Sequence, residues 1–296
     1  MKKIVLFVSI ALISINFCTA QEWFANFDFA KKLALVQDKM LFVVWEESLD
    51  FPYPITYTSN NGDLVFIDLS KNDNIDEVIW EHFIPVLLSE SNYDELAAKS
   101  KDRGARYIAK LNDDSIKIMD VNRNILNLKP SAIEQNLSLL INNYSLKTTF
   151  LKQDLINYSN KENFRTSFNL GSKYIDFALF VEKDTRNEVI ELANIYFEES
   201  KKHLAASDSD TKEVYTQRLA LLSIKEDLVL DKPRRALRLL KKMEVSAIAE
   251  RNYSLYSFLN YTTFKLLKDE KNLNLWQSKI SEADLKKAEL IFNINN

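Results

Sequence analysis

Three acidic side chains in one short segment have the type and spacing for acid–base chemistry. Glu46, Glu47 and Asp50 follow an apolar run that ends at Trp45. A pair of carboxylates can divide the roles of general acid and general base, as it does in glycosidases. Acidic residues in a loop are more often simply solvated. These carboxylates therefore support an enzyme of unrecognised type only as an alternative, and the main prediction is a protein that is not an enzyme.

Aromatic residues beside this acidic segment are the candidate interaction residues. Phe51, Tyr53 and Tyr57 lie in or next to a stretch that contains Pro52 and Pro54. Exposed aromatic side chains often mark protein contacts, because aromatic residues are enriched at the energetic centres of interfaces. A peptide- or glycan-binding module that uses these aromatics is a second alternative. In the competing structural interpretation, the same side chains cover the end of a sheet.

The remaining composition excludes many chemistries. The chain has only two histidines, His82 and His203, one cysteine and three glycines. A zinc site takes three or more protein ligands, and phosphate-binding loops need several glycines at fixed spacing. Glu77, Glu81 and His82 lie close together on one predicted helix, and we interpret them as a solvated acidic face and a packed histidine. The sequence predicts no catalytic, cofactor-binding or metal-binding residue.

Residues 1–20 have the pattern of a secretory signal peptide. Two lysines precede an apolar run, and small residues lead to a cleavage site after Ala20. Lipoprotein processing at Cys18 is an alternative, although the bulky Phe17 before it disfavours that modification. In both cases the exported chain keeps no free thiol, so thiol oxidoreductase activity is not expected. We predict export to the periplasm or the extracellular space.

Charge and hydropathy narrow the expected partners. The formal net charge is −3, and a mildly acidic chain has no general attraction for nucleic acid. No apolar run after the leader approaches the roughly 20 residues of a membrane span. A basic stretch at residues 232–242 is interpreted as a solvated helix face. The expected partner is another envelope or secreted protein.

The elements that must position these residues fall into two regions, and the first mixes strands and helices. Short apolar runs predict buried strands at 40–45 and 83–88. Asn61-Gly62 between two runs rich in β-branched and aromatic residues predicts a hairpin over 55–70. Alternating residues predict a strand at 115–121, followed by a turn and a strand at 125–126. Helices are expected at 21–39, 73–82, 92–101 and 130–146.

The second region is predicted to be entirely helical. Amphipathic patterns follow one another without a convincing strand from residue 148 onward. The fold class is thus an α/β N-terminal domain at 21–146 and an all-α domain at 147–296, after a signal peptide at 1–20. Helices are expected at 151–159, 164–181, 186–204, 212–229, 233–243, 247–267 and 281–292.

The order of elements over residues 22–146 resembles the exported thioredoxin-like proteins of bacteria. That family places a Trp-Cys-x-x-Cys motif after its first central strand, whereas here Trp45 is followed by Glu46 without a cysteine. The family also places a cis-proline before its next-to-last strand, and no proline precedes Ser115. The resemblance therefore implies a thioredoxin-like fold from which both halves of the redox site are missing.

The helical region resembles tetratricopeptide-like repeats in short fragments. Leu170-Gly171 and Tyr174 fit one part of that motif, and Ala193 with Phe197 fits another. Ala288-Glu289-Leu290-Ile291-Phe292 repeats the second part, but the 34-residue period is not kept. A helical bundle and a tetratricopeptide-like solenoid remain equal alternatives. Either would present a surface for a protein partner.

Overall fold

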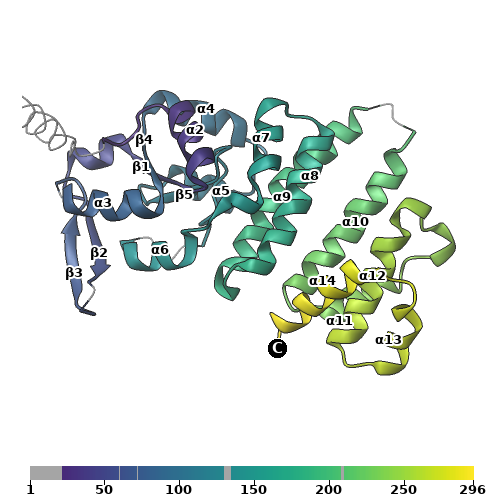
Figure 1. Cartoon of the computed structure of the whole chain (residues 1–296). Helices are drawn as coiled ribbons and strands as arrows, with labels where there is room; N and C mark the ends of the chain where they lie inside the picture. The colour runs from purple at the N-terminus through teal and green to yellow at the C-terminus, as the bar shows by residue number, and fades with distance from the viewer. Residues whose placement is uncertain (1–21, 60, 72, 130–134, 208–209) are drawn as a thin grey trace, which may run out of the picture.

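The computed structural model describes residues 22–296 apart from 60, 72, 130–134 and 208–209 (Figure 1). The predicted leader and Cys18 lie outside the described residues. Figure 1 shows a small sheet with surrounding helices in the N-terminal part and a succession of helices toward the C-terminus. The broad prediction of an α/β region followed by a helical region is confirmed, and the chain is mostly helical.

The central sheet has three strands in the order β4-β1-β5. β1 (Leu41–Trp45) pairs in parallel with β4 (Ile84–Leu88) and antiparallel with β5 (Lys117–Met119). Single bridges extend the sheet at both edges, Phe24 to Val86 in parallel and Met119 to Ile125 antiparallel. The first four residues of β1 are fully buried, as expected for an unbroken apolar run in a central strand.

The prediction of a helix over 21–39 is wrong at its start. Helix α2 spans Phe27–Gln37, and Phe24 lies instead in the bridge to β4. The Asn26 side chain accepts hydrogen bonds from the backbone amides of Asp28 and Phe29. This cap satisfies amides that have no partner inside the helix. The cap therefore fixes the helix start at Phe27, six residues later than predicted.

The predicted hairpin is confirmed as strands β2 (Pro54–Thr58) and β3 (Leu64–Asp68). Gly62 has a φ of +86°, a conformation that glycine adopts without strain, and its amide donates to the Ser59 carbonyl. The hairpin forms a separate two-stranded sheet beside the α/β region (Figure 1). Ile55 is buried, whereas Leu64 and Phe66 on the other face are exposed.

Helices surround the central sheet. α3 spans Asp73–His82, α4 Glu90–Ser100, α5 Ala105–Asn112 and α6 Leu137–Tyr144. The predicted helix at 130–146 is confirmed only over α6, since residues 130–134 lie outside the described residues. The sequence prediction missed α5, whose Tyr107 and Leu111 are buried one helical turn apart.

The helical region contains α7 (Lys152–Asn160), α8 (Phe164–Phe177), α9 (Lys183–Ala205), α10 (Lys212–Val229), α11 (Pro233–Leu240), α12 (Glu250–Leu266), α13 (Glu270–Gln277) and α14 (Glu282–Asn293). Among its described residues there is no strand, as predicted. Short 3-10 turns lie at Thr148–Phe150, Ala178–Phe180 and Val245–Ala247. The prediction missed α13, which has no buried residue and therefore a weak apolar stripe.

The tightest helix contact in this region joins α8 to α9 at Gly171. A Cβ atom there would lie 2.9 Å from the Phe197 ring and 3.1 Å from the Ala193 carbonyl oxygen. The motif fragments around Gly171 and Phe197 therefore meet across one helix pair, whereas the third fragment, at residues 288–292, lies on α14. Next to this contact, the rings of Tyr174 and Tyr196 stack with centroids 5.6 Å apart.

Candidate functional site

The three predicted carboxylates lie in one short 3-10 turn directly after β1. Glu46, Glu47 and Asp50 belong to the turn Glu46–Asp50, and all three are exposed. Within the described part of the chain none of them forms an ion pair. Their exposure agrees with the solvated interpretation. They line neither of the two hollows described below.

The predicted interaction aromatics have different environments. Phe51 is 71% exposed, whereas Tyr53 and Tyr57 are half-buried and pack against the core. The Tyr53 hydroxyl donates to the Asp114 carbonyl oxygen at 2.7 Å, just before β5. Tyr53 therefore closes the end of the sheet, while Phe51 faces solvent. None of the three side chains lines the helical hollows described in the following paragraphs.

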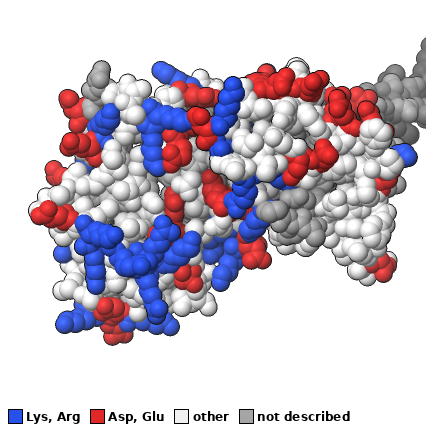
Figure 2. Space-filling view, turned by 180° about the vertical axis from the view of Figure 1, so that it is seen from behind, with Lys and Arg blue, Asp and Glu red and all other residues white. Residues whose placement is uncertain are grey.

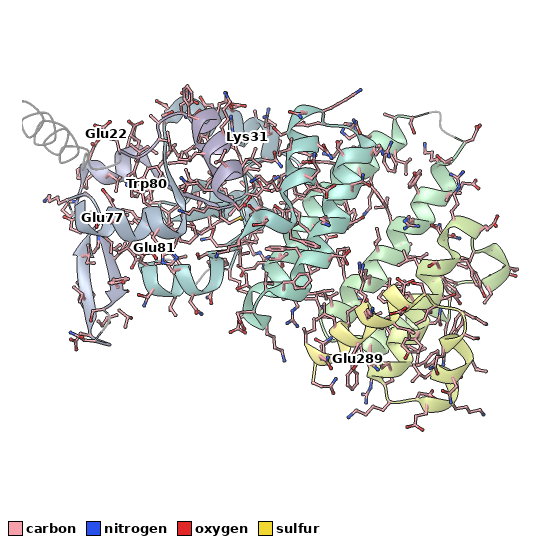
Figure 3. The ribbon with its side chains drawn as sticks, viewed as in Figure 1. Glu22, Lys31, Glu77, Trp80, Glu81 and Glu289 are labelled. Carbon is pink, nitrogen blue, oxygen red and sulfur yellow. The ribbon has the colours of Figure 1, made fainter. Side chains whose placement is uncertain are left out.

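Two acidic residues singled out on α3 face solvent. Glu77 and Glu81, labelled in Figure 3, are exposed, and the His82 Nδ1 lies 3.2 Å from the Ser145 hydroxyl. Across the described residues, no three histidine, cysteine, aspartate or glutamate side chains are grouped so that they could hold a metal ion. Nor does any described helix combine the length and apolar character that a membrane crossing requires.

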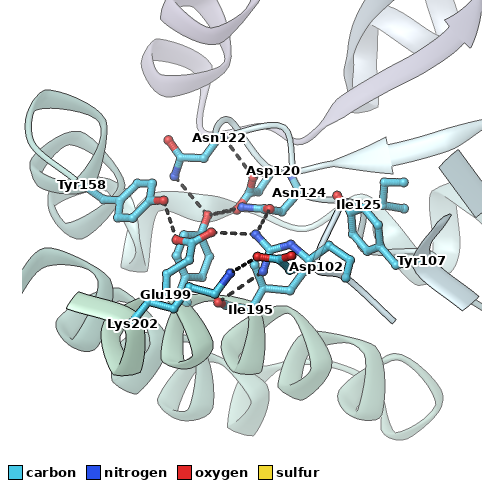
Figure 4. A network of polar contacts seen from close by, with 12 residues as sticks. Asp102, Tyr107, Asp120, Asn122, Asn124, Ile125, Tyr158, Ile195, Glu199 and Lys202 are labelled. Carbon is cyan, nitrogen blue, oxygen red and sulfur yellow. Dashed lines mark hydrogen bonds and ion pairs between the residues drawn. The ribbon is translucent and has the colours of Figure 1, made fainter. Parts of the chain in front are cut away.

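A buried polar cluster joins the α/β region to α8 and α9 (Figure 4). We call it the junction, and Asp120, which follows β5, is its centre. Asp120 is 0% exposed, and its carboxylate accepts hydrogen bonds from the hydroxyls of Tyr174 and Tyr196 and from the amides of Asn122 and Asn124. Burial raises the pKa of Asp120, and these hydrogen bonds partly oppose the shift.

A second part of the junction is an ion pair with a hydroxyl donor. Arg103 binds Glu199 at 2.6 Å and also reaches Asn124 and the carbonyl of Ile195. The Tyr158 hydroxyl donates to the other carboxylate oxygen of Glu199 at 2.5 Å. All of these donors and acceptors have partners within the protein. These contacts hold the two regions together. Some of the same residues, including Arg103 and Glu199, also line a hollow of about 200 Å³, and the buried Asn122 Oδ1 has no hydrogen-bond partner among the described residues.

On the other side of α8 lies a groove that faces α10, α12 and α14. One hollow of about 650 Å³ lies between α8, the end of α9 and the first turns of α10 and α12. A second hollow, of about 440 Å³, continues toward α14. The two share Phe168, Asn169, Arg218 and Arg251, so they form one continuous depression. We call it the helical groove.

The floor of the larger hollow is aromatic. Phe164 and Phe168 of α8 meet Tyr215 of α10, with ring centroids 4.7 and 5.6 Å from the tyrosine. The Asn163 side chain caps α8 by accepting a hydrogen bond from the backbone amide of Thr166. Phe164 and Phe168 are four residues apart in this helix, so they lie on the same side, one turn apart. Phe164 and Tyr215 are half-buried, so each leaves part of its ring open to the groove.

The walls of the larger hollow carry three arginines, and none of its described lining residues is acidic. The Arg218 guanidinium is held by the carbonyl of Arg251 at 3.1 Å and by the Asn252 side chain. Arg165 and Arg251 are exposed, and neither pairs with a carboxylate among the described residues. The larger hollow is therefore strongly positive in a chain whose formal net charge is −3.

The second hollow carries its own internal ion pairs. Asp176 binds Lys225 at 2.5 Å and Lys287 at 3.1 Å. Burial would raise the pKa of Asp176, but the two ammonium groups outweigh burial and lower it. Burial lowers the pKa of Lys225, and Asp176 opposes that shift. Because Asp154, Asp176 and Asp284 offset part of the positive charge there, the second hollow offers less unpaired positive charge to a ligand than the first.

The arrangement in the larger hollow suits binding better than catalysis. Arginine presents planar donors that match a carboxylate in a two-point contact. The aromatic floor can bury apolar side chains between these contacts. None of the lining residues of this hollow is a nucleophile with an adjacent base. The hollow can therefore hold a negatively charged, partly apolar ligand.

Sequence reasoning did not identify the helical groove. Its described lining residues come mostly from six helices, α7, α8, α9, α10, α12 and α14, and no short motif links Arg165, Arg218 and Arg251. One signal was present: Phe164, Arg165 and Phe168 place two aromatics and a cation on the first turns of a helix. That pattern alone does not distinguish a groove from an ordinary packed face. No protein-family model, curated protein or solved structure matches the chain.

Proposed function

We propose that this is an exported, non-catalytic protein whose helical region binds an acidic, extended segment of a partner protein. The observation that carries the proposal is the larger hollow of the helical groove. It combines three arginines with an aromatic floor, and none of its described lining residues is acidic. Acidic side chains of the partner would pair with Arg165 and Arg251, and apolar side chains would pack on the open parts of the Phe164 and Tyr215 rings.

For the N-terminal region we propose a thioredoxin-like domain that has lost its redox site. The pairing order from Phe24 through β4, β1 and β5 to Ile125 supports this proposal. Two parallel pairings followed by two antiparallel ones are typical of that sheet. Trp45 leads into Glu46 where the family has its first cysteine. Without a thiolate there is no attack on a disulfide, so the domain would act as a scaffold.

The test is peptide binding measured by fluorescence anisotropy. The probes are a labelled peptide that alternates glutamate with leucine and phenylalanine, and the same peptide with lysine replacing glutamate. We expect the acidic peptide to bind and the basic peptide not to bind. The double variant R165Q/R251Q should weaken binding roughly tenfold or more, because it removes two charge-assisted contacts.

A matched control carries the same change in charge elsewhere. R234Q/R238Q also removes two exposed arginines from the helical region, but neither residue lines the helical groove. It should bind the acidic peptide as the unmodified protein does. Equal loss in both double variants, or equal binding of both peptides, would show that the groove does not select an acidic segment.

A second candidate is contact through the hairpin and the turn before it. Phe51 and Phe66 are 71% and 76% exposed, which favours a surface for a peptide or glycan near Tyr53. Alanine at Phe51, Tyr53 and Tyr57 should then abolish ligand uptake. If uptake stays unchanged in that triple variant, this candidate is removed.

A further inference from the structure

A second positive hollow lies on α11, apart from the helical groove. It has a volume of about 560 Å³ and lies between the start of α11 and the end of α12. Its cations are Lys232, Arg234, Arg235, Arg238 and Lys268, and Asp231 is the only acidic residue among its described lining residues. It shares no lining residue with the helical groove. We call it the α11 hollow.

Most of these cations have no acidic partner. Arg235 lies 3.2 Å from Asp227, which fixes that guanidinium against α10. Among the described residues, no ion pair is found for Arg234, Arg238 or Lys268, and all three are exposed. Figure 2 shows lysine and arginine side chains gathered on the face of the C-terminal helices.

The repulsion between Arg234 and Arg238 is not offset by an ion pair to either residue among the described side chains. Arg234 and Arg238 are one helical turn apart, and like charges at that spacing destabilise a helix. Residues 232–243 contain six basic residues and no acid. A solvated helix face in a chain with more acidic than basic residues would be expected to mix the two signs. The arrangement therefore points to an anion that neutralises several cations together.

The floor of the α11 hollow is apolar. Leu266 and Leu267, at the end of α12, line it and are half-buried. A small inorganic anion would leave these side chains in contact with water. An anion that carries hydrocarbon next to its charge would cover them and pair with the arginines at once. A phosphate group suits the cations, because it carries up to two negative charges and several acceptor oxygens.

We infer that the α11 hollow binds a phosphate-bearing anion through Arg234, Arg238 and Lys268, with an apolar part of the ligand on Leu266 and Leu267. A phospholipid headgroup and a free phosphate compound share this chemistry. The inference does not depend on the proposed peptide-binding function, because the two hollows use different residues.

The experiment compares two phosphate sources on the full chain. One arm titrates inorganic phosphate by calorimetry. The other measures co-sedimentation with vesicles that contain phosphatidylglycerol, and with vesicles of phosphatidylcholine alone as the neutral control. We expect binding to the anionic vesicles that falls roughly 20-fold in R234Q/R238Q, since each basic residue near an anionic surface contributes about fivefold. Circular dichroism checks that the variant remains folded.

The groove variant R165Q/R251Q is the matched control, and it should bind anionic vesicles within about twofold of the unmodified protein. Binding of phosphate alone, lost in R234Q/R238Q, would support the site and identify a free phosphate compound as its ligand. Binding of anionic vesicles alone, lost in the same variant, would identify a lipid headgroup. No binding in either arm, or equal loss in both double variants, would overturn the inference.

Discussion

Two polar regions lie on either side of the α8–α9 pair, and they use similar residue types in opposite ways. In the junction, the Asp120 carboxylate is buried and accepts four hydrogen bonds. In the helical groove, Arg165 and Arg251 are exposed and have no carboxylate partner among the described residues. A polar group whose partners are all internal supports architecture, whereas one without them is available to a ligand. This contrast makes the two regions separable by mutation.

The largest effect is expected at the centre of the junction. Asp120→Ala would leave two buried tyrosine hydroxyls and two backbone amides without their acceptor. We expect the free energy of unfolding to fall by about 3–5 kcal/mol, measured by chemical denaturation. Glu198→Ala on α9 is the control, because Glu198 is exposed and should change stability by less than about 0.5 kcal/mol. Similar values for both variants would mean that the junction does not hold the regions together.

The second-largest effect on the free energy of unfolding is expected between the two regions, where Gly171 of α8 packs against α9. Alanine usually stabilises a helix relative to glycine by about 1 kcal/mol. At Gly171 the added Cβ would instead press on the buried Phe197 ring at 2.9 Å. We expect Gly171→Ala to destabilise the protein by about 1–3 kcal/mol in thermal or chemical unfolding. Asn169→Ala, at an exposed position of the same helix, should be neutral or slightly stabilising, and a neutral Gly171→Ala would show that α9 can move away.

A pH-dependent effect is expected at Glu226. This residue has fewer hydrogen bonds than Asp120 in the junction, but unlike Arg165 and Arg251 it is nearly buried. Its carboxylate is nearly buried between α10 and α9 and accepts one hydrogen bond from Asn194 at 3.3 Å. Burial raises the pKa of Glu226 to about 7. The folded protein then binds a proton more tightly than the unfolded chain, so this group makes stability fall as the pH rises from about 4.5 to 7.

Glu226→Gln should remove that slope. We expect the variant to gain on the order of 1–3 kcal/mol at pH 8 and to differ little at pH 4.5, as measured by denaturation at both values. Glu213→Gln, at an exposed position of the same helix, is the control and should leave the pH dependence unchanged. A variant that keeps the full slope would assign it to other groups.

The smallest effect on stability is expected in the helical groove. Because Arg165 and Arg251 are exposed and unpaired within the described chain, R165Q/R251Q should change the free energy of unfolding by less than about 0.5 kcal/mol. Thermal unfolding of the purified variant measures this directly. A loss of more than about 2 kcal/mol would mean that these arginines are structural, and the contrast between junction and groove would disappear.

Local sequence patterns predicted most of the elements but not their ends. The apolar run of β1 and the Asn61-Gly62 turn carry their own signals, because strand burial and turn conformation depend on neighbouring residues. The start of α2 depends on the Asn26 cap, and α13 has little apolar surface to detect. The first error comes from the energetics of a helix end, and the second from a helix that leaves little apolar periodicity in the sequence.

The candidate site was harder to predict than the fold. Sequence reasoning chose Phe51, Tyr53 and Tyr57 because they are close in the chain, yet only Phe51 is strongly exposed. The groove residues Arg165 and Arg251 are far apart in the chain and meet only through helix packing. Whether a charged side chain has a partner is a property of the folded molecule, and this property distinguishes the two regions.

The junction also determines how the chain should be divided for experiments. A fragment cut at residue 147, where the sequence pattern changes, would separate Asp120 from the two tyrosines that bind it. A fragment of residues 22–206 would retain α8 and α9 and keep those contacts. An expressed N-terminal fragment should therefore include α7, α8 and α9. A truncation designed from the sequence pattern alone would expose the buried Asp120 carboxylate to water.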